Sequence, residues 1–103
     1  MAFVLRFVQR YRIDSQDAFW KLEREFAELE RRTPGFPQGT RMRPVAGREP
    51  GHTLVWECEF PELADVHAAL RALESSPDHA ALFAQQSPLM LEGYTEIYER
   101  LDL

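Results

Sequence analysis

The chain has 103 residues, 45% of them hydrophobic and 28% charged, and its formal net charge is −5. This composition is typical of one globular domain, and the acidic balance argues against nucleic-acid binding, which depends on cations that neutralise phosphates. No stretch approaches the roughly 20 apolar residues that cross a bilayer, no signal-peptide pattern is present, and the single cysteine excludes an internal disulfide. We therefore expect one cytoplasmic domain over residues 1–103, without a nucleic-acid or membrane partner.

The first third of the chain predicts a strand followed by a helix. Residues 3–12 alternate between a hydrophobic side and a side that mixes valines with arginines, which is typical of a strand with one core face. Asp14 or Ser15 then caps a helix whose apolar side chains recur every three or four positions over residues 19–29. The segment 33–39 is rich in Pro and Gly and ends this helix.

The middle of the chain predicts two strands joined by a loop. Residues 40–46 carry the weakest strand pattern, because Pro44 has no amide donor and therefore belongs at a sheet edge. Gly and Pro over residues 47–51 favour a hairpin loop. Residues 52–60 alternate strongly and predict the third strand, with Cys58 on its apolar side as a buried structural thiol.

The last third predicts two helices and a strand. Residues 62–74 have a helical apolar stripe, and Ser76 followed by Pro77 is typical of a new N-cap and a short third helix. Residues 89–101 supply the last strand, with an irregularity near Gly93.

The resulting order, βαββαβ, predicts an α+β, ferredoxin-like fold: a four-stranded antiparallel sheet with its helices on one face. The first and third strands are then central neighbours. Their sides away from the helices mix valines with side chains that can pair across the sheet: Val4, Val8, Val55, Arg6, Arg10, Glu57 and Glu59.

This mixed face predicts an assembly. A solvated face does not need the valines, and a dry face cannot accept unpaired charges. We therefore expect the face to pack against the same face of a second copy, giving a homodimer with a barrel-like interior. The alternative is an exposed sheet face with ordinary surface ion pairs.

The chain also resembles a known superfamily. The element order, the strand HTLVWECEF, the helix after it and the turn SSPDH resemble the dimeric α/β-barrel proteins, which include the antibiotic-biosynthesis monooxygenase-like, NIPSNAP-like and stress-responsive barrel families. The resemblance covers almost the whole chain and implies the ferredoxin-like fold and the homodimer. Activities on this scaffold vary widely, so the resemblance leaves the reaction open. The sequence contains no asparagine, which argues against haem degradation and against an acylphosphatase, and the acidic third strand argues against an RNA-recognition domain.

Three residues are candidates for catalysis. His67 lies at the margin of the second helix's apolar stripe, where small environmental shifts set its charge near neutral pH. In an enzyme, His67 or Tyr94 would accept a proton and Arg6 would stabilise the developing anion. The alternative for His67 is a satisfied histidine at the edge of the core.

Aromatic residues suggest a ligand pocket. Tyr94 and Tyr98 on the last strand and Tyr11 on the first can surround a pocket mouth, an arrangement that suits a planar organic ligand. The alternative is that these tyrosines fill the seam of the barrel with their hydroxyls in water. The other candidate ligand-binding residues are Trp20, Trp56 and His79, the last in the first turn of the short helix. No two histidines have metal-ligand spacing with a carboxylate on the same face, so we expect no metal site.

Two functions remain open. One is a monooxygenase-like enzyme that acts on a small aromatic or polyketide-like molecule without a tightly held cofactor. The other is a non-catalytic dimeric module that binds a small ligand or serves assembly. A cavity that contains His67 and a tyrosine hydroxyl would favour the enzyme, and a filled core with all three histidines in solvent would favour the module.

Overall fold

The structure is a computed structural model that describes residues 2–103. The elements follow the predicted order, with the short third helix present: β1 (Ala2–Tyr11), a 3-10 turn (Ile13–Ser15), α1 (Gln16–Arg32), β2 (Thr40–Met42), β3 (Thr53–Phe60), α2 (Leu63–Glu74), α3 (Pro77–Gln86), a second 3-10 turn (Ser87–Leu89) and β4 (Met90–Arg100). Among the described residues, no helix combines the length and apolar character that crossing a membrane requires.

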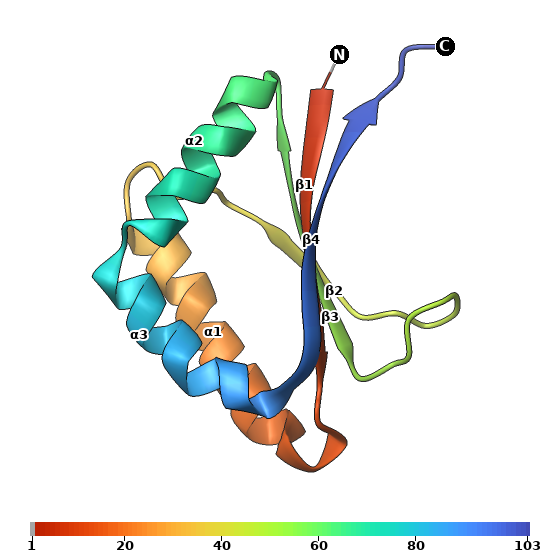
Figure 1. The fold of residues 1–103 in the computed structure, drawn as a ribbon, viewed down its shortest axis with the longest axis vertical. Helices are drawn as coiled ribbons and strands as arrows, with labels where there is room; N and C mark the ends of the chain where they lie inside the picture. Colours follow the sequence, from red (N-terminus) through yellow and green to blue (C-terminus); the bar gives the residue numbers. More distant parts are fainter. Residues whose placement is uncertain (1) are drawn as a thin grey trace.

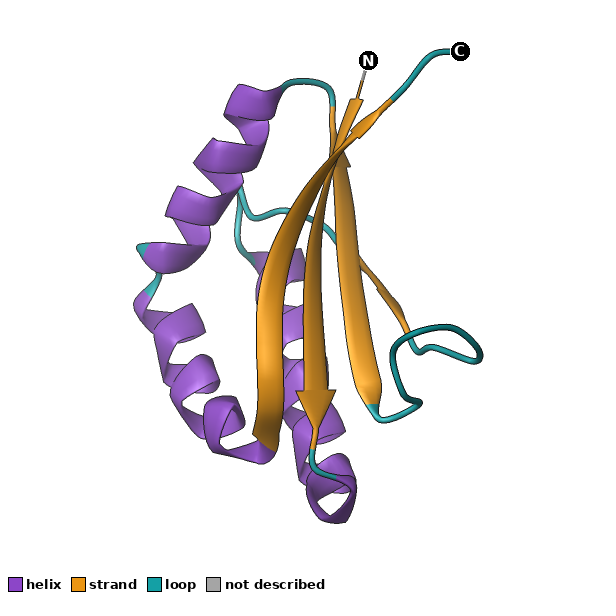
Figure 2. Ribbon diagram, turned by 45° about the vertical axis from the view of Figure 1, so that its right-hand side comes forward, coloured by secondary structure: helices purple, strands orange, loops and turns teal. Residues whose placement is uncertain are grey.

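The strands form one sheet in the order β2-β3-β1-β4, and each neighbouring pair is antiparallel. Figures 1 and 2 show all three α-helices on one side of this sheet, which we call the inner side. The predicted α+β, ferredoxin-like fold is therefore confirmed, with β1 and β3 at the centre.

Three local predictions about element ends need correction. β2 stops at Met42 instead of reaching residue 46, because Pro44 has no amide to donate to a ladder and the chain leaves the sheet before it. The irregularity expected near Gly93 lies slightly earlier, since Glu92 pairs with Arg10 and Met90 with Tyr11, leaving the residue between them as a bulge.

The third correction concerns the helix caps. Ser15 precedes α1, yet its side chain makes no capping hydrogen bond, because a 3-10 turn leads into the helix. The cap predicted for the short helix is confirmed: Ser76 Oγ accepts a hydrogen bond from the His79 backbone N–H at 3.1 Å, and Pro77 occupies the first helical position.

The core lies between the helices and the inner face of the sheet and has two buried groups. Leu5, Trp56 and Val66 form one group towards α2. Tyr11, Phe19 and Leu54 form the other, at the end of the sheet where α1 begins.

On the outer face of the sheet, opposite the helices, residues that face each other across neighbouring strands form rows, and these rows alternate between apolar and charged side chains. One row is apolar, because Val8 is paired with Val55 on one side and with Tyr94 on the other. Val8 is only 3% exposed within the single chain, while Val4 and Val55 are half-buried. The loop between β2 and β3 extends to this side of the sheet (Figure 1), and its Glu49 accepts a hydrogen bond from Tyr94 Oη.

The charged rows of the outer face are paired as expected, with one difference. Arg6 Nε donates to Glu57 at 2.6 Å, so the predicted pairing between β1 and β3 is present. Arg10, however, pairs with Glu92 of β4 at 2.8 Å rather than with a glutamate of β3. The register explains this, because the β3 residue opposite Arg10 is a threonine.

Candidate functional site

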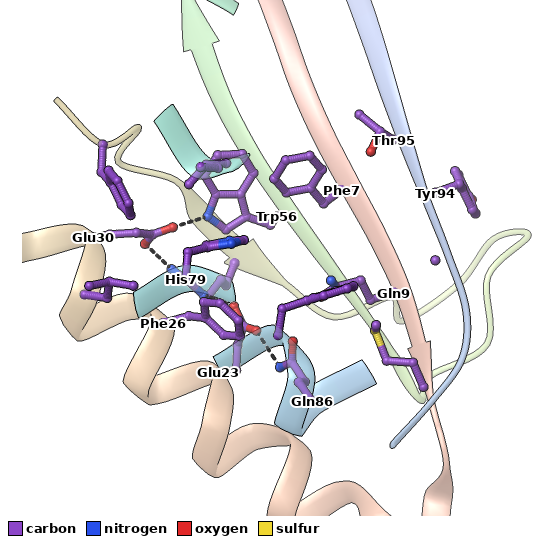
Figure 3. A pocket seen from close by; sticks show the side chains of 17 residues that line it. Phe7, Gln9, Glu23, Phe26, Glu30, Trp56, His79, Gln86, Tyr94 and Thr95 are labelled. Atoms are coloured by element: carbon purple, nitrogen blue, oxygen red, sulfur yellow. Dashed lines mark hydrogen bonds and ion pairs between the residues drawn. The ribbon is translucent and has the colours of Figure 1, made fainter. Parts of the chain in front are cut away.

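A cavity of about 400 Å³ lies between α1, α3 and the inner face of the sheet. Its walls are mainly apolar, and the lining residues include Phe7, Phe26, Phe36, Trp56 and Phe83. Figure 3 shows that labelled polar side chains gather at the α1 and α3 side of the cavity, including Glu23, Glu30, His79 and Gln86. A mostly apolar pocket with a few convergent polar groups is typical of small-molecule sites.

At the centre of the polar group, Arg41 of β2 bridges two glutamates of α1. Its Nε donates to Glu23 at 2.6 Å and its Nη1 donates to Glu30 at 2.8 Å. Glu23 and Glu30 are seven residues apart, or two helical turns, so both side chains project from the same face of α1. Arg41 lies opposite Trp56 in the register of β2 and β3, which places it on the inner side of the sheet.

Trp56 and Gln86 complete this arrangement from β3 and α3. Trp56 Nε1 donates to Glu30 at 2.7 Å, and Gln86 Nε2 donates to Glu23 at 2.9 Å. Each carboxylate oxygen of the two glutamates therefore accepts one hydrogen bond. We call these five residues, Glu23, Glu30, Arg41, Trp56 and Gln86, the polar cluster. It ties α1, α3, β2 and β3 together at the cavity wall.

The ionisation of Arg41 and His79 follows from their surroundings. Burial lowers the pKa of Arg41, but hydrogen bonds to Glu30 and Glu23 outweigh it, and the pKa lies above its ordinary value. Burial lowers the pKa of His79 below 6.5, and the nearby charge of Glu23 opposes this only in part. The His79 imidazole, which packs against Phe26 with ring centroids 5.1 Å apart, is therefore mainly neutral at pH 7.

The structure does not bring the three predicted catalytic residues together. His67 is exposed on α2 and lies outside the cavity lining. Arg6 lies on the outer face, paired with Glu57. Tyr94 borders the cavity, but its side chain points away from it (Figure 3) towards Glu49.

The predicted ligand-binding residues divide into two groups. Trp56 and His79 line the cavity. Tyr11 belongs to the buried core, stacked on Phe19 at 4.5 Å, and Trp20 packs edge-on against both rings. Tyr98 lies on the outer face, 4.9 Å beneath the guanidinium of Arg6.

Sequence reasoning missed most of the polar cluster. Glu23 and Glu30 lie outside the apolar stripe predicted over residues 19–29, yet both are buried. A signal was available, because both lie beside the apolar stripe of α1 and repeat at the same spacing of seven. No comparable signal marks Arg41 or Gln86, whose positions depend on how β2 and α3 pack against α1.

Two other predictions concern metals and the cysteine. Within residues 2–103, no group of three or more His, Cys, Asp or Glu side chains is placed to hold a metal ion.

Cys58 is half-buried on the inner side of β3. Burial raises the pKa of its thiol, which fits a structural residue better than a nucleophile.

Comparison with known proteins gives structural similarity at low sequence identity. No protein-family model matches the chain, and no curated protein sequence matches it. A NIPSNAP family protein from Agrobacterium tumefaciens is 17% identical, with a TM-score of 0.80 over 99% of this chain and 95% of that one. An uncharacterized NIPSNAP-like domain protein from Burkholderia xenovorans is also 17% identical, with a TM-score of 0.78 over 97% and 85% of the two chains.

A third similar structure is a proposed antibiotic biosynthesis monooxygenase from Nitrosomonas europaea, 17% identical, with a TM-score of 0.72 over 97% of this chain and 90% of that one. Identities this low establish a shared fold and leave the activity open. The chain therefore has the ferredoxin-like fold found in antibiotic-biosynthesis monooxygenase-like and NIPSNAP proteins, as its sequence resemblance implied.

Proposed function

We propose that the protein binds a small aromatic molecule in the cavity and removes a proton from it, as a monooxygenase-like enzyme without a tightly held cofactor. The observation that carries this proposal is the His79 imidazole at the wall of an aromatic cavity, where burial lowers its pKa. The cavity volume of about 400 Å³ falls in the range of small-molecule pockets, roughly 300–1,000 Å³. One structural neighbour is named as a proposed monooxygenase, and the proposal extends that chemistry to this chain.

The proposed reaction can be written with its atoms and electrons balanced. His79 takes a proton from an activated CH₂ group of the ligand, and the electron pair left on carbon attacks molecular oxygen, the second substrate. The peroxide anion that forms takes this proton back from His79, and the resulting hydroperoxide loses water and leaves a carbonyl group. Overall, the CH₂ group and O₂ give C=O and H₂O, and the ligand supplies all the electrons. The base is thus His79 in place of His67, because only His79 reaches the cavity.

Oxygen uptake tests this proposal. Fused-ring phenols and ketones with an activated CH₂ group are offered to the protein in an oxygen electrode. We expect His79→Gln to abolish protein-dependent uptake, whereas His67→Gln, a matched change on an exposed histidine outside the lining, retains it. Equal uptake by the wild type and His79→Gln contradicts the role of His79. Saturable binding without uptake by the wild type favours the non-catalytic ligand-binding module.

We propose in addition that the protein is a homodimer that buries the outer face of the sheet. The apolar row through Val55, Val8 and Tyr94 continues to Met42 of β2, whose side chain is 44% exposed. The arginines of this face are already paired with glutamates within the chain, so packing against the same face of a second copy leaves no arginine of these pairs without a carboxylate. Size-exclusion chromatography with light scattering should give twice the chain mass. A monomer at micromolar concentration contradicts the proposal.

A further inference from the structure

The polar cluster carries one more negative charge than positive. Glu23 and Glu30 are 5% and 9% exposed, and the single guanidinium of Arg41 lies between them. Among the described residues that line the cavity, no other Arg or Lys is present, and His79 is mainly neutral. Both carboxylates are hydrogen-bonded, but they share one cation, so the buried cluster keeps a net negative charge that a cationic ligand group would offset.

Gln86 supplies an independent observation. Its side chain is 1% exposed, and Figure 3 shows it turned from α3 towards the cavity. Because Glu23 can only accept, the amide NH₂ of Gln86 must face it, which fixes the amide oxygen on the other side. That oxygen, Oε1, has no hydrogen-bond partner among residues 2–103. A buried acceptor of this kind calls for a donor.

The remaining groups at this end of the cavity favour the same kind of ligand. A neutral His79 keeps one ring nitrogen as an acceptor. The aromatic walls, among them Phe26 and Trp56, attract cations through their ring faces. Arg41 is the group that an anionic ligand would approach, but the two carboxylates that flank it, at 2.6 and 2.8 Å, would repel such a ligand.

We infer that the cavity takes an aromatic molecule that bears an ammonium group, and that the ammonium lies among Glu23, Gln86 Oε1 and His79. The inference rests on the proposed function, since it names the charge class of the ligand bound in that same cavity. The ammonium offsets the excess negative charge and donates to the unpartnered amide oxygen. Its positive charge also balances the negative charge that is left on the ligand once His79 has taken a proton from it.

Three ligands with one ring system and different charges test the inference: tryptamine, indole-3-ethanol and indole-3-propionate. Binding is followed in ¹⁵N-labelled protein by the indole N–H signals. Trp56 lies in the cavity, whereas Trp20 lies outside its lining and serves as an internal reference. We expect saturable shifts at Trp56, with tryptamine binding at least about tenfold more tightly than the alcohol and the propionate binding weakest.

The outcomes separate the inference from the proposed function. If the alcohol or the propionate binds as tightly as tryptamine, the inference is overturned while ligand binding in the cavity stands. If none of the three shifts Trp56, the inference is overturned, and the oxygen-uptake assay decides the proposed function separately.

A variant pair tests the residues assigned to the ammonium. Glu23→Gln removes the charge and should bring tryptamine to the affinity of the alcohol, whereas Glu25→Gln, an exposed residue of the same helix outside the lining, should keep the tenfold preference. An undiminished preference in Glu23→Gln overturns the assignment. Should that variant not fold, the wild-type ligand series decides by itself.

Discussion

Glu30 shows how one buried carboxylate joins three elements. It lies on α1, accepts a hydrogen bond from Trp56 of β3 and forms an ion pair with Arg41 of β2. A glutamine at position 30 keeps the shape of the side chain, but its NH₂ group then faces either Trp56 or Arg41 and cannot accept the hydrogen bond from that donor. We expect Glu30→Gln to lower the free energy of unfolding by about 2–3 kcal/mol in urea denaturation. Glu28→Gln, on the exposed side of the same helix and paired with the exposed Arg31, should change it by less than about 1 kcal/mol.

His79 should make stability depend on pH. Burial lowers its pKa in the folded protein, so below the ordinary value of 6.5 the unfolded chain binds the proton more readily. Stability is therefore lost as pH falls through 6.5 towards the folded-state pKa. Urea denaturation at about pH 7.5 and about pH 5.5 should show a smaller difference in His79→Gln than in the wild type. An identical difference in both proteins would contradict the assignment.

The short strand β2 depends on a close approach to the indole of Trp56. A Cβ atom on Gly39, just before β2, would lie 2.0 Å from Trp56 Nε1, closer than any side chain permits. Gly39→Ala should therefore displace the indole from Glu30 and cost about 1–3 kcal/mol of unfolding free energy. The Trp56 indole N–H signal should shift at the same time. Gly51→Ala is the control, because its nearest neighbour would be the Pro44 carbonyl at 4.0 Å.

The loop between β2 and β3 is held to the outer face by Tyr94. The hydrogen bond to Glu49 raises the pKa of the Tyr94 phenol from 10.0 to about 12. Because the folded-state pKa is the higher one, this contact contributes stability below pH 10, and the contribution is lost as pH rises towards 12. Absorbance titration of tyrosinate should show a late step from Tyr94, and Glu49→Ala should move that step towards pH 10. An unchanged titration curve in Glu49→Ala would mean that the loop is not held there.

In the whole molecule, the two faces of the sheet have different roles. The inner face forms the cavity, and the outer face, with its paired arginines, is the proposed dimer interface. Met42→Lys places a charge in the apolar outer row and should give a monomer by light scattering with the fold intact. Leu63→Lys, at a similarly exposed position on α2, should remain dimeric. The reverse result would move the interface to the helix side.

Local patterns were sufficient to predict the elements and their faces. Alternation along residues 52–60 correctly placed Cys58 on the apolar, inner side, and the pair Ser76–Pro77 correctly marked the start of α3. These features depend on neighbouring residues in the chain, through backbone geometry and capping, so a single sequence contains them.

The site itself depended on contacts between distant segments. Helical periodicity can bring Glu23 and Glu30 to one face, but their partners Arg41 and Gln86 come from β2 and α3, whose positions follow from strand register and helix packing. The same non-local geometry excluded His67 from the cavity and admitted His79. The sequence by itself determined the order and faces of the elements. Only the tertiary structure decided which side chains meet, because burial and pairing across elements arise when those faces pack together.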